Sequence, residues 1–217
     1  MATSLDDFPS VSLVSTEDLL RAMPLPIAVV GNGPIGKPYG EVIDSHATVI
    51  RFNNFRLTGH EASAGTKVTH WCQNGVVDHL SFRPRLIRWA INALDPNRPR
   101  GIKTNPHVDA NTTCFCPRAF DWVLVENCKQ LLHIELHCVA DATLLYPLRA
   151  VIPFPTTGFA TLYLLLKFQP QVSVFGFSGL SNGHYWNQRH RHTRSHSSTA
   201  HLELELIQAT SRIQFHG

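Results

Sequence analysis

Residues 25–55 read LPIAVVGNGPIGKPYGEVIDSHATVIRFNNF and decide the fold class. Residues 27–30 form a short, continuous apolar run that leads into a glycine turn, which is the pattern of a parallel strand buried on both faces. A helix is predicted through residues 39–45, and residues 46–52 have the composition of a second strand. This order of strand, helix and strand is typical of α/β proteins.

The same alternation continues along the rest of the chain. Further strands are predicted at residues 67–72, 112–117, 134–140, 171–177 and 212–215. Helices are predicted at residues 19–23, 76–94, 119–133, 159–168 and 199–211. The pattern favours an α/β fold, a single Rossmann-like α/β/α sandwich with a mostly parallel sheet. Ligands of such sheets bind beyond the carboxyl ends of the strands, so we expect a site at the turns after Val30 and Phe175.

Length and composition narrow the classes of protein that need to be considered. The chain has 217 residues, 43% of them hydrophobic and 16% charged, which suits one globular domain. We expect an N-terminal arm at residues 1–24 and a catalytic domain at residues 25–217. The net charge of +3 is too small, and too dispersed, to indicate a nucleic-acid partner, but it suits an anionic ligand.

The sequence shows no membrane or export signal. No apolar run has the length of a membrane-spanning helix, and the N-terminus is acidic and broken by Pro9. We therefore expect no stable membrane insertion and a cytoplasmic location.

The glycine turn fits two nucleotide-binding patterns, each incompletely. Gly31, Gly33 and Gly36 match GxGxxG, but the second strand ends in VIRFNNF without the acid of a dinucleotide site, which leaves only an NADP interpretation through Arg51. Residues 31–37 match most of a P-loop, yet Pro38 stands where a hydroxyl would bind Mg²⁺. A tight turn without any ligand is the remaining alternative.

Longer motifs elsewhere in the chain help to choose between these interpretations of the glycine turn. Four motifs follow one another along the chain. They are residues 29–55, residues 155–177 (PTTGFATLYLLLKFQPQVSVFGF), His184-Tyr185 and His196. Together they resemble the large, small and C-terminal motifs of the animal-type sialyltransferases, glycosyltransferase family 29. The resemblance implies a GT-A-like variant of the Rossmann fold. It also implies an inverting, metal-independent enzyme that moves sialic acid from CMP-sialic acid to a hydroxyl of an acceptor glycan.

The resemblance assigns roles to particular residues. His196 is expected to be the general base, since the pKa of histidine lies near the operating pH. His184 is expected to meet the phosphate of the leaving CMP. Capping of a helix by Thr157 and exposed loop positions for both histidines are the alternatives. The residues expected to bind the donor are Asn32, Gly33, Asn53, Thr156, Thr157, Gly158 and Tyr185.

Three departures from the family pattern stand out. The family has a glutamate five residues after its last histidine, where this chain has His201; either Glu203 or Glu205 takes over, or the role is lost. Animal members join their large and small motifs by a disulfide. Near the positions of those two cysteines this chain has Ile27 and Gln169. Animal members also carry a membrane anchor, so the chain is expected to be a soluble microbial or algal relative.

Other functions stay open at this point. A transferase of another CMP-linked keto acid such as CMP-Kdo, a CMP- or glycan-binding protein without activity, and an NAD(P)-dependent oxidoreductase are the alternatives. We expect no cofactor and no metal; His190 and His192 form an HxH pair, but no scaffold for a metal is evident. Trp186, in a polar loop, is the candidate to stack on a sugar.

Overall fold

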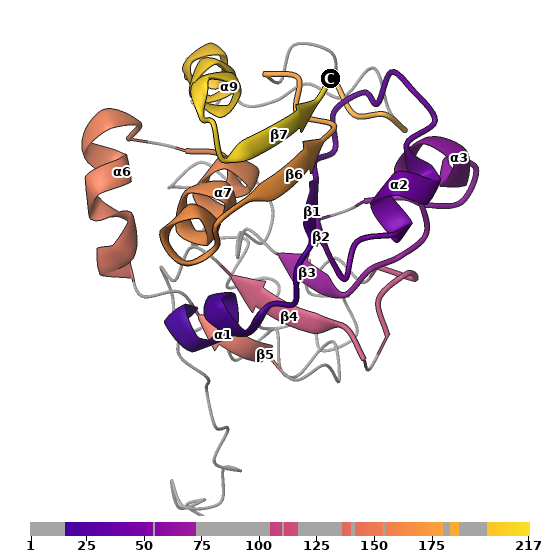
Figure 1. Ribbon diagram of the computed structural model, residues 1–217, viewed down its shortest axis with the longest axis horizontal. Helices are drawn as coiled ribbons and strands as arrows, with labels where there is room; N and C mark the ends of the chain where they lie inside the picture. Colours follow the sequence, from indigo (N-terminus) through magenta and orange to yellow (C-terminus); the bar gives the residue numbers. More distant parts are fainter. Residues whose placement is uncertain are drawn as a thin grey trace, which may run out of the picture.

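The described part of the chain forms one seven-stranded sheet with helices on both faces (Figure 1). The computed structural model describes residues 16–53, 55–72, 105–109, 111–116, 136–139, 142–153, 155–179, 183–186 and 199–217. The strand order is β5-β4-β3-β2-β1-β6-β7, and every ladder between these strands is parallel. The strands are β1 (Ile27–Val30), β2 (Thr48–Phe52), β3 (His70–Cys72), β4 (Thr113–Cys116), β5 (Leu136–Val139), β6 (Val172–Phe175) and β7 (Ile213–His216).

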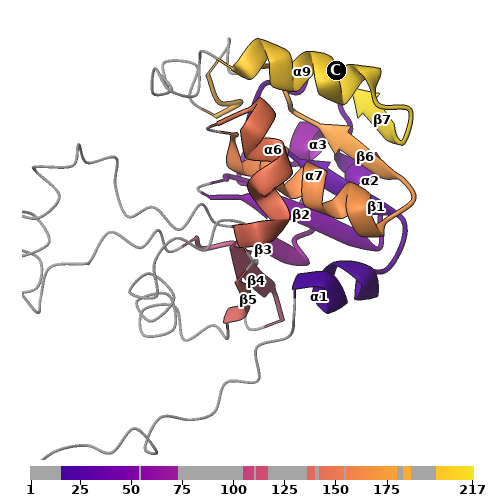
Figure 2. The same cartoon turned by 90° about the vertical axis from the view of Figure 1, so that its left-hand side faces the viewer.

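The order of the strands reverses once, beside β1. The chain adds β1 to β5 in one direction and then returns to place β6 and β7 on the other side of β1, as Figure 2 shows from the side. Val30 at the end of β1 pairs with Phe175 at the end of β6, so two carboxyl ends lie next to each other. Such a topological switch point is where open parallel sheets bind their ligands.

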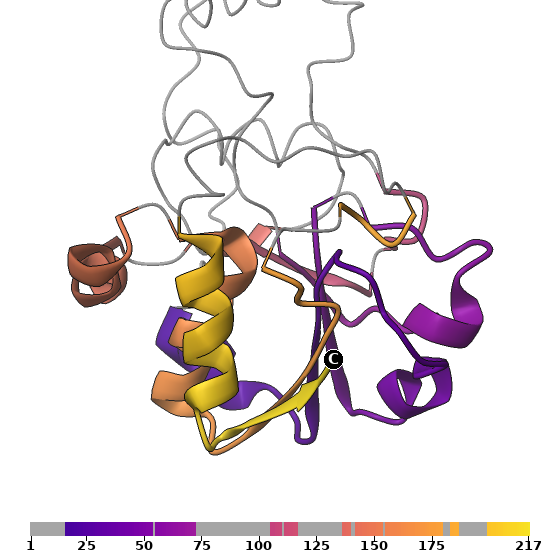
Figure 3. The same cartoon turned by 90° about the horizontal axis from the view of Figure 1, so that it is seen from above.

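The helices form two outer layers (Figure 3). One face of the sheet carries α1 (Thr16–Ala22), α6 (Tyr146–Val151), α7 (Thr157–Phe168) and α9 (Ala200–Ala209). The opposite face carries α2 (Gly40–Asp44) and α3 (Glu61–Ala64). The fold is therefore the α/β/α sandwich expected from the sequence, and its described ladders are entirely parallel.

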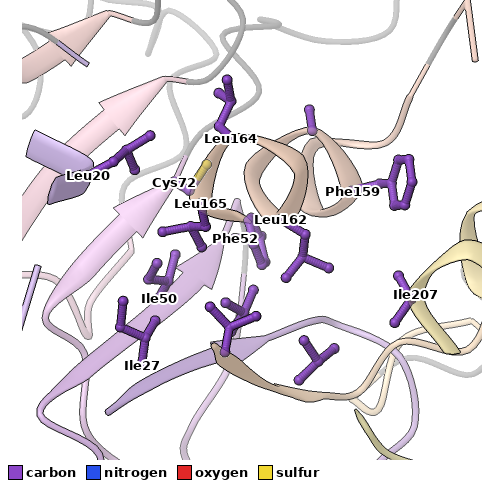
Figure 4. Close-up of a cluster of buried hydrophobic side chains, with 14 of the residues drawn as sticks. Leu20, Ile27, Ile50, Phe52, Cys72, Phe159, Leu162, Leu164, Leu165 and Ile207 are labelled. Atoms are coloured by element: carbon purple, nitrogen blue, oxygen red, sulfur yellow. The ribbon is translucent and has the colours of Figure 1, made fainter. Parts of the chain in front are cut away.

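The main core lies between α7 and the sheet. Leu162 and Leu165 of α7 are fully buried against Ile27 and Ile50 of the central strands, with Ile207 of α9 closing one side (Figure 4). Residues of β1, β2 and β6 are buried on both faces, and their sequences are accordingly apolar except for Thr48, Arg51 and Ser173. No helix in the described ranges is both long and apolar enough to cross a membrane.

A hydrogen bond ties the end of α7 to α1. Gln169, only 5% exposed, follows the last residue of α7 and donates from Nε2 to the carbonyl oxygen of Leu20. Leu20 itself is 1% exposed and belongs to the main core. Residues within the predicted N-terminal arm thus pack on the domain, while the division at residue 24 stays a prediction.

Asp44 anchors the loop before β3 on the other face. Its carboxylate accepts hydrogen bonds from the backbone N–H groups of Thr66 and Lys67 and from the Thr66 hydroxyl, at 2.8–2.9 Å. Burial raises the pKa of Asp44, but these hydrogen bonds and the charge of Arg51 outweigh it and hold that pKa below its ordinary value. The carboxylate is therefore a structural anchor.

The sequence predictions can be compared with these elements one by one. All seven strands were expected, with boundaries that differ by a few residues. Helix α3 and the continuous pair formed by the 3₁₀ helix Ala142–Leu145 and α6 were not predicted. The helices expected at residues 76–94 and 119–133 lie outside the described residues.

Candidate donor-binding site

The turns that follow β1 and β6 are hydrogen-bonded to each other. Gly31 N–H donates to the carbonyl of Phe175 at 2.7 Å, and Gly33 N–H donates to that of Gly176 at 2.8 Å. A Cβ atom on Gly31 would lie 2.4 Å from the Gly176 oxygen, and one on Gly33 would lie 2.7 Å from it. Both glycines are therefore required by the close approach of the two turns. This requirement exists without any ligand.

The ring of Phe177 lies between two glycines from distant parts of the sequence. A Cβ on Gly31 would be 2.8 Å from Phe177 Cδ2, and a Cβ on Gly158 would be 2.8 Å from Phe177 Cε1. The ring also meets Phe52 edge-on, with centroids 6.2 Å apart. Phe177 thus fixes the spacing between the turn after β1 and the start of α7. Sequence reasoning did not single it out, although it ends the strand motif at residues 155–177.

Asn32 follows β1 and is held by its neighbours. Its Nδ2 donates to the carbonyl of Phe52 at 3.2 Å, and its own carbonyl accepts from Tyr185 N–H at 2.9 Å. The Nδ2 contact sets the orientation of the amide, because a flipped amide would place two acceptors against each other. Its Oδ1 is buried and has no hydrogen-bond partner within the described ranges. Asn32 therefore keeps an unused acceptor at the switch point.

Asn53 follows β2 with an unusual backbone. Its φ of 48° is positive, and it is the one non-glycine residue of the described chain with this conformation. Its N–H donates to the carbonyl of Cys72 at 3.0 Å, and its carbonyl accepts from the indole of Trp71 at 2.8 Å. These contacts hold the residue after β2 in the left-handed region that asparagine tolerates better than most side chains.

The start of α7 is bound by a carboxylate from α9. Thr156 is the N-cap, and its hydroxyl accepts a hydrogen bond from Phe159 N–H at 3.2 Å. That hydroxyl donates to Glu203 Oε2 at 2.6 Å, while Thr156 N–H donates to Glu203 Oε1 at 2.7 Å. Glu203 is 5% exposed. The single hydroxyl hydrogen of Thr156 is thus used within the protein.

The next backbone groups of α7 remain available. In the described part of the chain, the N–H groups of Thr157 and Gly158 have no hydrogen-bond partner. They belong to the first turn of a helix, where the dipole favours an anion. Thr157 as a whole residue is 8% exposed, whereas Gly158 is partly exposed.

Residues 183–186 pass beside Asn32. The Tyr185 hydroxyl donates to the carbonyl of Arg56 and accepts from its N–H, and the Tyr185 ring lies 5.1 Å from that of His60. Burial raises the pKa of Tyr185, while the charge of Arg51 and the hydrogen bond from Arg56 lower it in part. Because the resulting pKa stays above its ordinary value, the phenol is neutral at physiological pH.

His184 and Trp186 form an aromatic pair in the same segment. Their ring centroids are 4.5 Å apart, and Trp186 also packs against the buried cluster of Phe55, Leu57 and Trp71. Trp186 is therefore only partly available to stack on a sugar. The role of His184 toward a phosphate stays a prediction. His184 directly precedes Tyr185, whose N–H donates to the Asn32 carbonyl.

Several predicted donor residues therefore meet at the switch point. Asn32 and Tyr185 are joined by a backbone hydrogen bond, Gly33 contacts the turn after β6, and Gly158 is linked to that turn by Phe177. His196 lies outside the described residues. On α9, His201 and Glu205 are exposed whereas Glu203 is buried. No group of three or more histidine, cysteine, aspartate or glutamate side chains suited to a metal occurs among the described residues.

Comparison with known proteins agrees with this architecture. The sequence model of glycosyltransferase family 29 (sialyltransferase) matches residues 15–82. The human type 2 lactosamine alpha-2,3-sialyltransferase is 27% identical over 168 residues, covering 69% of this chain and 48% of the human protein. The mouse protein of that name is 33% identical over 168 residues, covering 69% of this chain and 49% of its own length. Sialyltransferase-like protein 1 of rice is 47% identical over 58 residues, covering 26% of this chain and 15% of the rice protein.

Solved structures support the same fold. A crystal structure of a mammalian sialyltransferase superimposes with a TM-score of 0.57 at 18% identity, covering 87% of this chain and 67% of that one. At this identity the likeness shows the fold. The architecture is that of a Rossmann-like α/β/α fold with its candidate site at the topological switch point. The chain belongs to glycosyltransferase family 29, and it spans about half the length of the curated relatives that it matches.

Proposed function

We propose that this chain binds CMP-sialic acid and transfers its sialic acid to a hydroxyl of an acceptor glycan. The observation that carries the proposal is the meeting of the family motifs at one switch point. The turn at Asn32, the start of α7 and the segment of His184 and Tyr185 are far apart in sequence but in contact through backbone hydrogen bonds and the Phe177 ring. Their shared position beyond the strand ends suits a nucleotide.

The proposed donor matches the chemistry of these groups. CMP-sialic acid carries a carboxylate and a phosphodiester, and the N–H groups of Thr157 and Gly158 are suited to an anion at a helix N-terminus. Asn32 Oδ1 is suited to a hydroxyl or amino group, because the phosphate and the carboxylate carry no hydrogen at neutral pH. His184 would donate a hydrogen bond to the phosphate as CMP leaves.

The transfer itself requires that the acceptor hydroxyl lose a proton. We assign this step to His196, with inversion at the anomeric carbon in a single displacement and without a metal. The transition state is expected to resemble an oxocarbenium ion, as in other glycosyl transfers. The resemblance of the C-terminal motif supports this assignment, since His196 stands where the family has its last motif histidine.

The test is the release of CMP from CMP-sialic acid in the presence and absence of glycan acceptors. We expect acceptor-dependent release by the wild type and a loss of at least about 100-fold in kcat for His196→Ala, the usual contribution of a general base. CMP-Kdo in the same assay separates the two keto-acid donors. Full activity of the His196→Ala variant would exclude this base.

A CMP-binding protein without transferase activity is the second candidate. It is favoured by His201, which stands at the position where the family has a glutamate. Calorimetric titration with CMP separates the two candidates. Binding without acceptor-dependent turnover, unchanged by His196→Ala, supports the second. Absence of CMP binding contradicts both.

A further inference from the structure

The carboxylate of Glu203 connects the C-terminal helix to the donor side of the site. Its two oxygens accept from Thr156 N–H at 2.7 Å and from the Thr156 hydroxyl at 2.6 Å. Both contacts are shorter than a usual N–H···O or neutral O–H···O bond, as expected for an ionised acceptor. Glu203 lies on α9, forty-seven residues further along the chain.

From this geometry we infer that Glu203 is the carboxylate of the last family motif in this chain, and that it positions the donor through Thr156. The inference rests on the proposed function. A carboxylate in this region could instead orient His196 and stabilise its protonated form, but the contacts of Glu203 lead to Thr156. Glu203 is thus a positioning residue, which acts on the donor through the start of α7.

Three observations favour Glu203 over the other candidates. His201, at the position that the family spacing assigns, cannot accept two hydrogen bonds from Thr156, and its side chain is exposed. Glu205 lies two residues after Glu203. Because side chains at positions i and i+2 of a helix point in nearly opposite directions, Glu205 is exposed. Glu203 is the one buried acid on α9.

The contacts of Glu203 determine which backbone groups can meet a ligand. Thr156 N–H is taken by the carboxylate, while the N–H groups of Phe159 and Ala160 are bonded to Thr156 itself. Of the first N–H groups of α7, those of Thr157 and Gly158 are therefore the ones that can donate to a ligand. By fixing the Thr156 backbone and hydroxyl together, Glu203 fixes the direction of these two donor groups.

The decisive variants keep the negative charge and change only the geometry. Glu203→Asp retains the carboxylate but is one methylene too short to keep both contacts with Thr156. Thr156→Val removes the hydroxyl, and Thr156→Ser restores it. Glu205→Asp is the matched control on the exposed face of α9. CMP affinity is measured by calorimetry, and the pH profile of kcat is measured with CMP-sialic acid.

We expect Glu203→Asp and Thr156→Val each to weaken CMP binding about tenfold, the scale of one charge-assisted hydrogen bond. Thr156→Ser is expected to regain most of the affinity that Thr156→Val loses, and Glu205→Asp is expected to bind CMP like the wild type. The double variant should lose little more than either single variant, because both changes break the same link. The pH profile of kcat should keep its shape.

Other outcomes overturn the inference. If CMP affinity is unchanged while the pH profile shifts, the carboxylate orients the base. If only the melting temperature falls, the link is merely structural. If Glu203→Asp does not fold, the comparison of Thr156→Val with Thr156→Ser decides alone. If the wild type itself does not bind CMP, it is the proposed function that fails, and this result is separate from every outcome above.

Discussion

Replacing Gly158 by alanine tests the packing of Phe177 at the centre of the site. The new Cβ would lie 2.8 Å from Phe177 Cε1 and 2.9 Å from Cζ, whereas ordinary contact begins at 3.4 Å. The ring must therefore move by about 0.6 Å, the difference between 3.4 and 2.8 Å. It cannot withdraw easily, because Gly31 lies against its other side and Phe52 meets its edge.

Two effects of opposite sign decide the result. Overpacking a well-filled site costs about 1–3 kcal/mol, while replacing glycine by alanine in a helix gains at most about 1 kcal/mol. We expect Gly158→Ala to lower the free energy of unfolding by about 1–2 kcal/mol, which is roughly 2–8 °C in Tm for a chain of this size. Thermal unfolding followed by circular dichroism measures this change.

Gly36→Ala is the matched control. A Cβ on Gly36 would have no neighbour within 4 Å, so we expect its Tm to stay within about 1–2 °C of the wild type or to rise slightly. Adding Phe177→Leu to Gly158→Ala should cost less than the sum of the two single changes, since the added methyl then has room. A Gly158→Ala variant as stable as the wild type would refute the packing argument.

Three further changes test other parts of the structure. Asp44→Asn should cost about 1–2 kcal/mol, because hydrogen bonds to a charged, half-buried group are lost. The folded-state pKa of Asp44 is below its ordinary 3.8, so this stabilisation is complete above about pH 4 and is lost as the pH falls through the folded-state pKa. Acid titration of the wild type and of Asp44→Asn measures the difference. Burial, with a contribution from the charge of His46, lowers the pKa of His216 below 6.5. The folded protein is therefore fully stable with respect to this group above that pH and loses stability as His216 is protonated on acidification. His216→Phe should abolish this part of the dependence of Tm on pH. Tyr185→Phe removes two hydrogen bonds to Arg56, and we expect a loss of about 1 kcal/mol in unfolding free energy by urea titration.

The centre of the sheet could be predicted because β1, β2 and β6 are buried on both faces. Residues 27–30 are apolar throughout, and residues 172–175 are apolar except for Ser173, so both predict buried strands. Helix α3 has only four residues, too few for a helical period to show in the sequence. Helix α6 carries a proline in its first turn, a start signal that could have identified it.

The candidate site was predictable where it lies within a motif. Asn32, Gly158 and Tyr185 come from motif segments, and the fold brings their segments together. The link between Glu203 and Thr156 was not predictable, because it depends on how α9 lies on α7 and not on spacing along the chain. The motif spacing itself indicated His201, two residues before the acid that makes the contact.

The position of β6 beside β1 has a consequence for how the protein acquires its site. All of β2 to β5 is synthesised between these two strands, so the pairing of Val30 with Phe175 closes a very long loop of chain. Contacts of such sequence separation form slowly. A nascent chain that has already built β1 to β5 still lacks the turn after β6 and the Glu203 contact. The proposed nucleotide affinity should therefore appear only at the last stage of folding, and it can serve as a reporter of complete assembly.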